Sequence, residues 1–134
     1  MPRRPLKTRV SLWLPPLVYM AIIFYLSSQS DPLPAVTARV WDKLLHAIEY
    51  AGLAALLGRA LLGEGLRPVT AFAAAALLAA AYGATDEYHQ LSVPLRNGDL
   101  QDWLVDVMGA SLGALACVLP HKQKYGGSFS DPAH

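Results

Sequence analysis

Four long apolar runs, separated by short polar segments, dominate the hydrophobic pattern of the chain. They cover residues 10–26, 44–62, 69–90 and 100–119. A helix rises about 1.5 Å per residue, so roughly 17–25 residues cross a hydrocarbon core about 30 Å thick. The runs are too long and too rich in alanine and leucine for strands, and backbone groups in lipid must bond within their own segment. The pattern predicts an all-α bundle of four transmembrane helices.

Composition supports a membrane protein of one domain. Of 134 residues, 54% are hydrophobic and 16% are charged, whereas soluble domains carry about 25% charged residues. A net charge of +1 gives no basic field for nucleic acid, and the single Cys117 excludes an internal disulfide. We expect one membrane domain over residues 1–119 and a flexible, polar, cytoplasmic tail over 120–134.

The chain begins with basic residues followed by the first apolar run, which is also the arrangement in a signal peptide. The sequence SSQSDPLP comes directly after it, however, and contains no small-x-small cleavage site. We therefore expect an uncleaved anchor, kinked or loosened by Pro15 and Pro16.

Basic residues predict the orientation, because they accumulate on the cytoplasmic side of a membrane. With four spans both termini lie on one side. That side holds eight lysines and arginines and the other side three, namely Arg39, Lys43 and Arg96. We expect both termini in the cytoplasm, with Trp41 and Trp103 at the outer interface.

Polar residues recur on one face near the outer end of each of the last three runs. Each set has helical spacing, and the members are Asp42, His46 and Glu49, then Tyr82, Asp86 and His89, then Asp99, Asp102 and Asp106. Charges at membrane depth are costly, so such side chains pair with each other or line a wet cavity. The spacing predicts a polar pocket between the helices that opens to the outside, with Lys43, His46, His89 and Arg96 as its counter-charges.

Small residues predict where helices pack closely. Ala71, Ala75, Ala79 and Gly83 recur at every fourth position, and Gly109 and Gly113 form GxxxG. The GxxxG pair could also be the seam of a homodimer.

Four segments together resemble the VanZ-like family of small bacterial membrane proteins. These are SSQS, DKLLHAIEYAGLAALL, YGATDEYHQLSVPLR and DLQDWLVDVMGASLG, and the resemblance covers about residues 24–115. It implies a multi-pass protein of the bacterial cytoplasmic (inner) membrane. The family's namesake is linked to low-level resistance to the glycopeptide teicoplanin, so the resemblance also implies a role at the cell envelope. One departure is Leu95, in VPLR, where the family usually has VPGR.

Three functions fit this pattern. The pocket binds a lipid headgroup or a cell-envelope precursor, with Arg96 and Lys43 on phosphate and carboxylates on amines or hydroxyls. Alternatively, the protein is a membrane-embedded acid–base or metal-dependent enzyme, using Asp86 with His89 or Glu49 with His46. In the third hypothesis the polar residues form a purely structural network that fixes how the helices align with one another.

No HExxH, GxSxG or phosphate-binding loop is present, which favours binding over catalysis. The catalytic candidates are Glu49, Asp86 and His89. The predicted pocket residues are Asp42, Lys43, His46, Glu49, Tyr82, Asp86, His89, Gln90, Arg96, Asp102 and Asp106. No cofactor is predicted, although His and carboxylate side chains would also suit a divalent metal.

Overall fold

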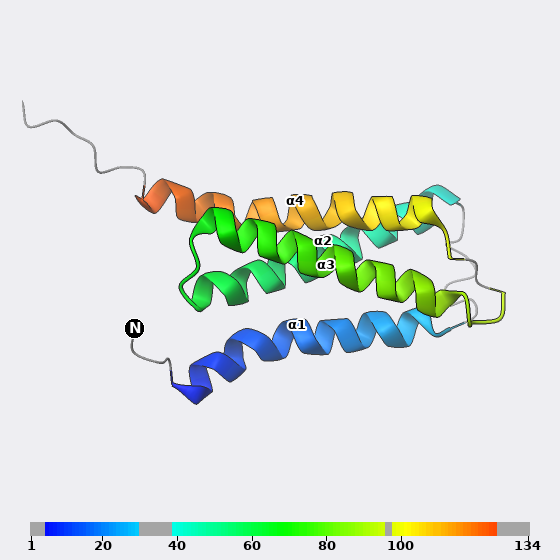
Figure 1. Ribbon diagram of the computed structural model, residues 1–134, viewed down its shortest axis with the longest axis horizontal. Coiled ribbons are helices and arrows are strands. Elements are labelled where there is room, and N and C mark those ends of the chain that lie inside the picture. Colours follow the sequence, from blue (N-terminus) through cyan, green and yellow to red (C-terminus); the bar gives the residue numbers. More distant parts are fainter. Residues whose placement is uncertain (1–4, 30–38, 96–97, 126–134) are drawn as a thin grey trace, which may run out of the picture.

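Four antiparallel helices make up the described part of the chain. The computed structural model describes residues 5–29, 39–95 and 98–125, and side chains within 5–29, 43–95 and 98–121. The helices are α1 (Leu6–Ser27), α2 (Arg39–Gly63), α3 (Pro68–Gln90) and α4 (Leu100–Tyr125). They run alternately up and down, so α1 begins and α4 ends at the same end of the bundle (Figure 1).

Each of the four helices is long and apolar enough to cross a bilayer. Large apolar side chains cover the outside of the bundle, with Leu77 71% exposed and Leu112 65% exposed. In water such a surface would be unfavourable, whereas lipid solvates it. The predicted four-transmembrane-helix bundle is therefore confirmed, and the chain is a multi-pass membrane protein.

The helices pack through small residues, as the sequence predicts. Gly109 and Gly113 of α4 face the backbone of Ala47 and Ala51 of α2, so closely that an added Cβ would overlap their carbonyl oxygens. The series of small residues at every fourth position of α3, which we call the α3 ridge, is also buried. Its members Ala71, Ala75 and Ala79 have no exposed surface. GxxxG thus serves packing within one chain, and a homodimer through the same glycines stays an untested expectation.

A tight hairpin joins α2 to α3 and also holds α1. Gly65 adopts a φ of 96°, which glycine tolerates without strain, and Pro68 opens α3. Glu64, in this turn, accepts from Arg9 Nε at 2.9 Å and from Trp13 Nε1 at 3.0 Å. These contacts fasten the start of α1 to the rest of the bundle.

Three helix boundaries differ from the predicted runs by four or more residues. Helix α1 begins at Leu6 and continues through Pro15 and Pro16, α2 begins at Arg39, and α4 continues through Pro120 to Tyr125. Apolar composition marks where lipid would end, but a helix can extend into polar sequence as long as its backbone bonds continue. Residues 120–125, predicted as flexible tail, are therefore helical; residues 126–134 lie outside the described part.

Candidate functional site

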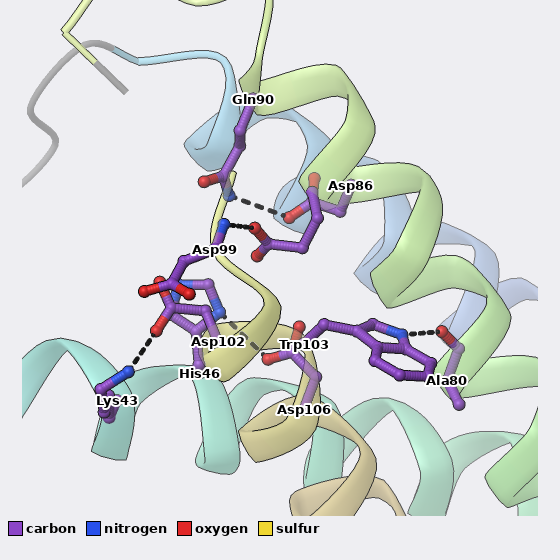
Figure 2. A network of polar contacts seen from close by, with 10 residues as sticks. Lys43, His46, Ala80, Asp86, Gln90, Asp99, Asp102, Trp103 and Asp106 are labelled. Atoms are coloured by element: carbon purple, nitrogen blue, oxygen red, sulfur yellow. Dashed lines mark hydrogen bonds and ion pairs between the residues drawn. The ribbon is translucent and has the colours of Figure 1, made fainter. Parts of the chain in front are cut away.

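The polar stripes predicted on α2, α3 and α4 gather at one end of the bundle. The end of α1, the start of α2, the end of α3 and the start of α4 meet there (Figure 1). At this end of the bundle, polar side chains of α2, of α3, of α4 and of the residues just before α4 point toward one another (Figure 2).

A buried pair of His46 and Asp106 lies at the centre of this end. His46 Nδ1 is 3.0 Å from Asp106 Oδ1, and Asp106 has no exposed surface. The carboxylate oxygen can only accept, so Nδ1 donates. The pair forms because α2 and α4 approach closely one turn away, where Gly109 meets Ala47.

Glu87 of α3 completes the centre from a third helix. Its Oε2 accepts from the backbone N–H of Asp99 at 2.9 Å. A ring nitrogen of His46 and one carboxylate oxygen each of Glu87 and Asp106 lie within 4.8 Å of one another. All three residues are buried.

Glu87 is absent from the predicted pocket, although the sequence contains a signal for it. The small residues from Ala71 to Gly83 recur at every fourth position, and Glu87 is the next member of that series. Residues on this ridge face the neighbouring helices, so a charge that continues it faces them too.

Asp86, Gln90 and Tyr50 lie beside the centre. Gln90 Nε2 donates to Asp86 Oδ2 at 3.3 Å, and both residues are 4% exposed. Tyr50 of α2 is fully buried, one turn below His46. We call His46, Tyr50, Asp86, Glu87, Gln90 and Asp106 the polar cluster.

Four oxygen atoms of the polar cluster are buried without a hydrogen-bond partner among the described residues. They are the Tyr50 hydroxyl, Asp86 Oδ1, Glu87 Oε1 and Asp106 Oδ2. Each such atom costs about 1–3 kcal/mol, and native proteins rarely leave several together without a water, an ion or a functional role. The cluster therefore offers acceptor atoms to a further group.

Lys43 and Asp102 lie at the rim of the cluster. Lys43 Nζ is 2.7 Å from Asp102 Oδ1, with the lysine side chain 30% exposed. The pair links α2 to α4 beside the His46–Asp106 pair (Figure 2).

Tyr82 and His89 of the predicted α3 stripe both contact α1, although the Tyr82 ring also lies against that of Tyr50. The Tyr82 hydroxyl donates to the Met20 carbonyl oxygen at 2.6 Å. His89 Nε2 lies 3.0 Å from Ser28 Oγ, and its ring stacks on Phe24 at 4.5 Å. The stripe faces the boundary between α1 and the polar cluster. Relative to Tyr82, Asp86 is rotated by about 40° in one direction and His89 by about 20° in the other, so Asp86 points to the cluster and His89 to α1.

Of the pairs suggested for catalysis, Asp86 and His89 each have a hydrogen bond to another residue. Asp86 bonds Gln90 and His89 bonds Ser28, whereas His46 bonds Asp106. Glu49 is half-buried on α2. The Asp42 side chain and Arg96 lie outside the described residues.

An open groove adjoins the cluster between the end of α3 and the start of α4. It has a volume of about 410 Å³ and its lining includes Ala84, Tyr88, Leu91, Leu100 and Trp103. Glu87 and Asp99 also line it. Because Glu87 belongs to both, it joins the apolar groove to the buried polar cluster.

A comparison with protein families gives one match, which covers nearly the whole chain. The model of the VanZ/LLP1 family matches residues 5–121. No curated protein and no solved structure matches the chain.

Proposed function

The chain belongs to the VanZ/LLP1 family, and we propose that it binds the polar headgroup of a membrane lipid or lipid-linked cell-envelope precursor. The headgroup enters the polar cluster, and part of the lipid's apolar chain lies in the groove between α3 and α4. The site opens to the outer face of a bacterial cytoplasmic membrane.

The unpartnered oxygen atoms of the cluster carry this proposal. Tyr50, Asp86, Glu87 and Asp106 supply them from three helices, and all four residues are at least nine-tenths buried. A network that only fixed helix register would satisfy its own members, since each unpaired group lowers stability.

The chemistry of these atoms selects the headgroup. Carboxylate oxygens accept, so they favour a ligand rich in donors, such as an amine or sugar hydroxyls. Lys43 at the rim offers an ammonium that suits a phosphate at the base of the headgroup.

The groove supports a lipid rather than a soluble ligand. Tyr88 and Leu91 are 77% and 64% exposed, and Leu100 is 69% exposed. An acyl or prenyl chain can pack against these side chains without removing water from polar groups. Glu87 lines the groove and belongs to the cluster, so a lipid chain in the groove would lie next to a headgroup in the cluster.

Filling the groove tests the proposal. Ala84 is exposed and lines the groove, whereas the exposed Ala81 lies one turn earlier on α3 and does not line it. We expect Ala84→Phe to reduce the amount of lipid that co-purifies with the protein in mild detergent at least several-fold, measured by mass spectrometry per mole of chain. Ala81→Phe should retain the wild-type amount.

Equal lipid content in Ala84→Phe, Ala81→Phe and the wild type would contradict the proposal. The mass of the retained lipid also distinguishes an ordinary membrane lipid from a lipid-linked cell-envelope precursor.

A second candidate is a membrane-embedded enzyme acting on the same lipid. The His46–Asp106 pair favours it, since a histidine oriented by a carboxylate can transfer protons, and Glu87 lies beside it. Release of a headgroup from the co-purified lipid by wild-type protein, and not by His46→Gln, would establish this activity.

A further inference from the structure

We propose that His46, Glu87 and Asp106 bind one divalent transition-metal ion, Zn²⁺ or Mn²⁺. This goes beyond the proposed function, because the ion would bind whether or not a lipid is present. The three side chains come from α2, α3 and α4, so the packing of the bundle itself sets their arrangement.

The positions of the ligand atoms fit a single ion. One nitrogen of His46 and one carboxylate oxygen each of Glu87 and Asp106 lie within 4.8 Å of one another. If Nδ1 is the ligand, the ion replaces the proton that Nδ1 shares with Asp106 Oδ1, because metal ligands are deprotonated. Zn²⁺ binds such atoms at about 2.0–2.2 Å, which separates neighbouring ligands by roughly 3.3–3.6 Å. Small side-chain rotations therefore suffice to close the site around an ion.

The types of ligand select the metal. An imidazole nitrogen with two carboxylate oxygens suits Zn²⁺ or Mn²⁺, whereas Mg²⁺ and Ca²⁺ prefer oxygen ligands alone. Such a set also leaves coordination positions for water or for an oxygen of a bound molecule.

Two buried oxygen atoms independently indicate a ligand here. Asp106 Oδ2 and Glu87 Oε1 have no hydrogen-bond partner among the described residues. Asp106 is 0% exposed and Glu87 is 9% exposed. A cation would satisfy both atoms and offset the cost of burying two carboxyl groups.

The surroundings of the ligands resemble the outer shell of a metal site. The backbone N–H of Asp99 holds Glu87 Oε2 at 2.9 Å and fixes the direction of its carboxyl group. Hydrogen bonds of this kind orient ligating carboxylates in metal sites. Asp86 Oδ1 and the Tyr50 hydroxyl are not ligands and remain for a headgroup.

Metal binding to the full chain tests this inference. The protein, carrying an affinity tag without histidine, is purified in detergent, stripped with a chelator and dialysed against Zn²⁺ or Mn²⁺ separately. Bound metal is then counted by elemental mass spectrometry. We expect one Zn²⁺ or Mn²⁺ ion per chain, with Mg²⁺ binding at least tenfold more weakly.

Variants assign the site. Glu87→Gln and Asp106→Asn should each weaken binding at least tenfold. Glu64→Gln, which removes a carboxylate that pairs with Arg9 at the opposite end of the bundle, should bind as the wild type does. Circular dichroism and size-exclusion chromatography show whether each variant is folded. If Asp106→Asn does not fold, the comparison of Glu87→Gln with the wild type decides the result.

Two results would overturn the metal site: no saturable binding of either ion to the wild type, or equal affinity in Glu87→Gln and the wild type. Lipid content measured on the same stripped protein keeps the two proposals apart. Retained lipid without metal binding would refute only the ion site.

Discussion

At the scale of single residues, Leu95 shows where a side chain conflicts with its backbone. Its φ is 66°, in the left-handed region, and its side chain is 92% exposed. Leucine has no contact there that would offset the cost of this conformation, which is about 1–2 kcal/mol for a residue with a Cβ. A glycine, which the resemblance to the family implies at this position, would fit the turn without strain.

Leu95→Gly should therefore stabilise the protein. We expect the free energy of unfolding in detergent to rise by roughly 0.5–1 kcal/mol, because relief of strain exceeds the added freedom of the unfolded chain. Leu91→Gly is the matched control, since Leu91 is also exposed but has a φ of −60°. Loss of stability in Leu95→Gly would contradict this explanation of the turn.

The polar residues were predictable as a group but not in their pairs. His46 and Asp106 could be assigned to one end of the bundle, because both lie on polar faces at the same level. Their pairing depends on the rotation of each helix, which small residues set by packing. That rotation also turned His89 toward α1 and brought Glu87 into the cluster.

At the scale of elements, the approach of α2 to α4 determines the geometry of the site. Gly113 faces the backbone of Ala51, and Gly109 faces that of Ala47 next to His46. Lipid supplies no hydrophobic force between helices, so such close contact is a main source of attraction in the bundle.

Gly113→Ala should separate the two helices. The added methyl overlaps backbone atoms of Ala51, which cannot rotate away, so we expect a loss of about 1–3 kcal/mol in the free energy of unfolding or a failure to fold. Ala116→Val, on the exposed face of α4, controls for added volume and should have little effect. Unchanged stability in Gly113→Ala would show that the close contact is not needed.

The helices themselves could be predicted almost completely, and their ends only in part. Apolar length identified four spans, which are confirmed. Helix α4 extends to Tyr125 because its polar last turns keep their backbone bonds beyond the apolar run. Hydropathy contains no information about such extensions, since it measures the preference for lipid and not for helix.

At the scale of the whole molecule, the polar cluster and most of the described basic residues lie at opposite ends. Among the described residues, six basic positions belong to the end at which α1 begins and α4 ends, namely Lys7, Arg9, Arg59, Arg67, Lys122 and Lys124. We expect this end in the cytoplasm, which directs the cluster outward.

A reporter that is active only outside the cytoplasm, such as alkaline phosphatase, tests this orientation. Fused after residue 134 it should be silent, and fused to a chain truncated after Val93, beyond the third span, it should be active. High activity of the full-length fusion would reverse the proposed orientation and direct the cluster inward.

The central claim is that the polar cluster is a ligand site and not a network that only holds the helices together. Tyr50 separates these alternatives, because its hydroxyl is fully buried and has no partner among the described residues. The most direct measurement is the free energy of unfolding of delipidated Tyr50→Phe, together with its lipid content before delipidation.

We expect Tyr50→Phe to be as stable as the wild type or more stable by about 1 kcal/mol, since it removes an unsatisfied buried group, and to retain less lipid. Tyr25→Phe, at a tyrosine that is 65% exposed, should change neither quantity. A Tyr50→Phe protein that is less stable and retains the wild-type amount of lipid would contradict the claim.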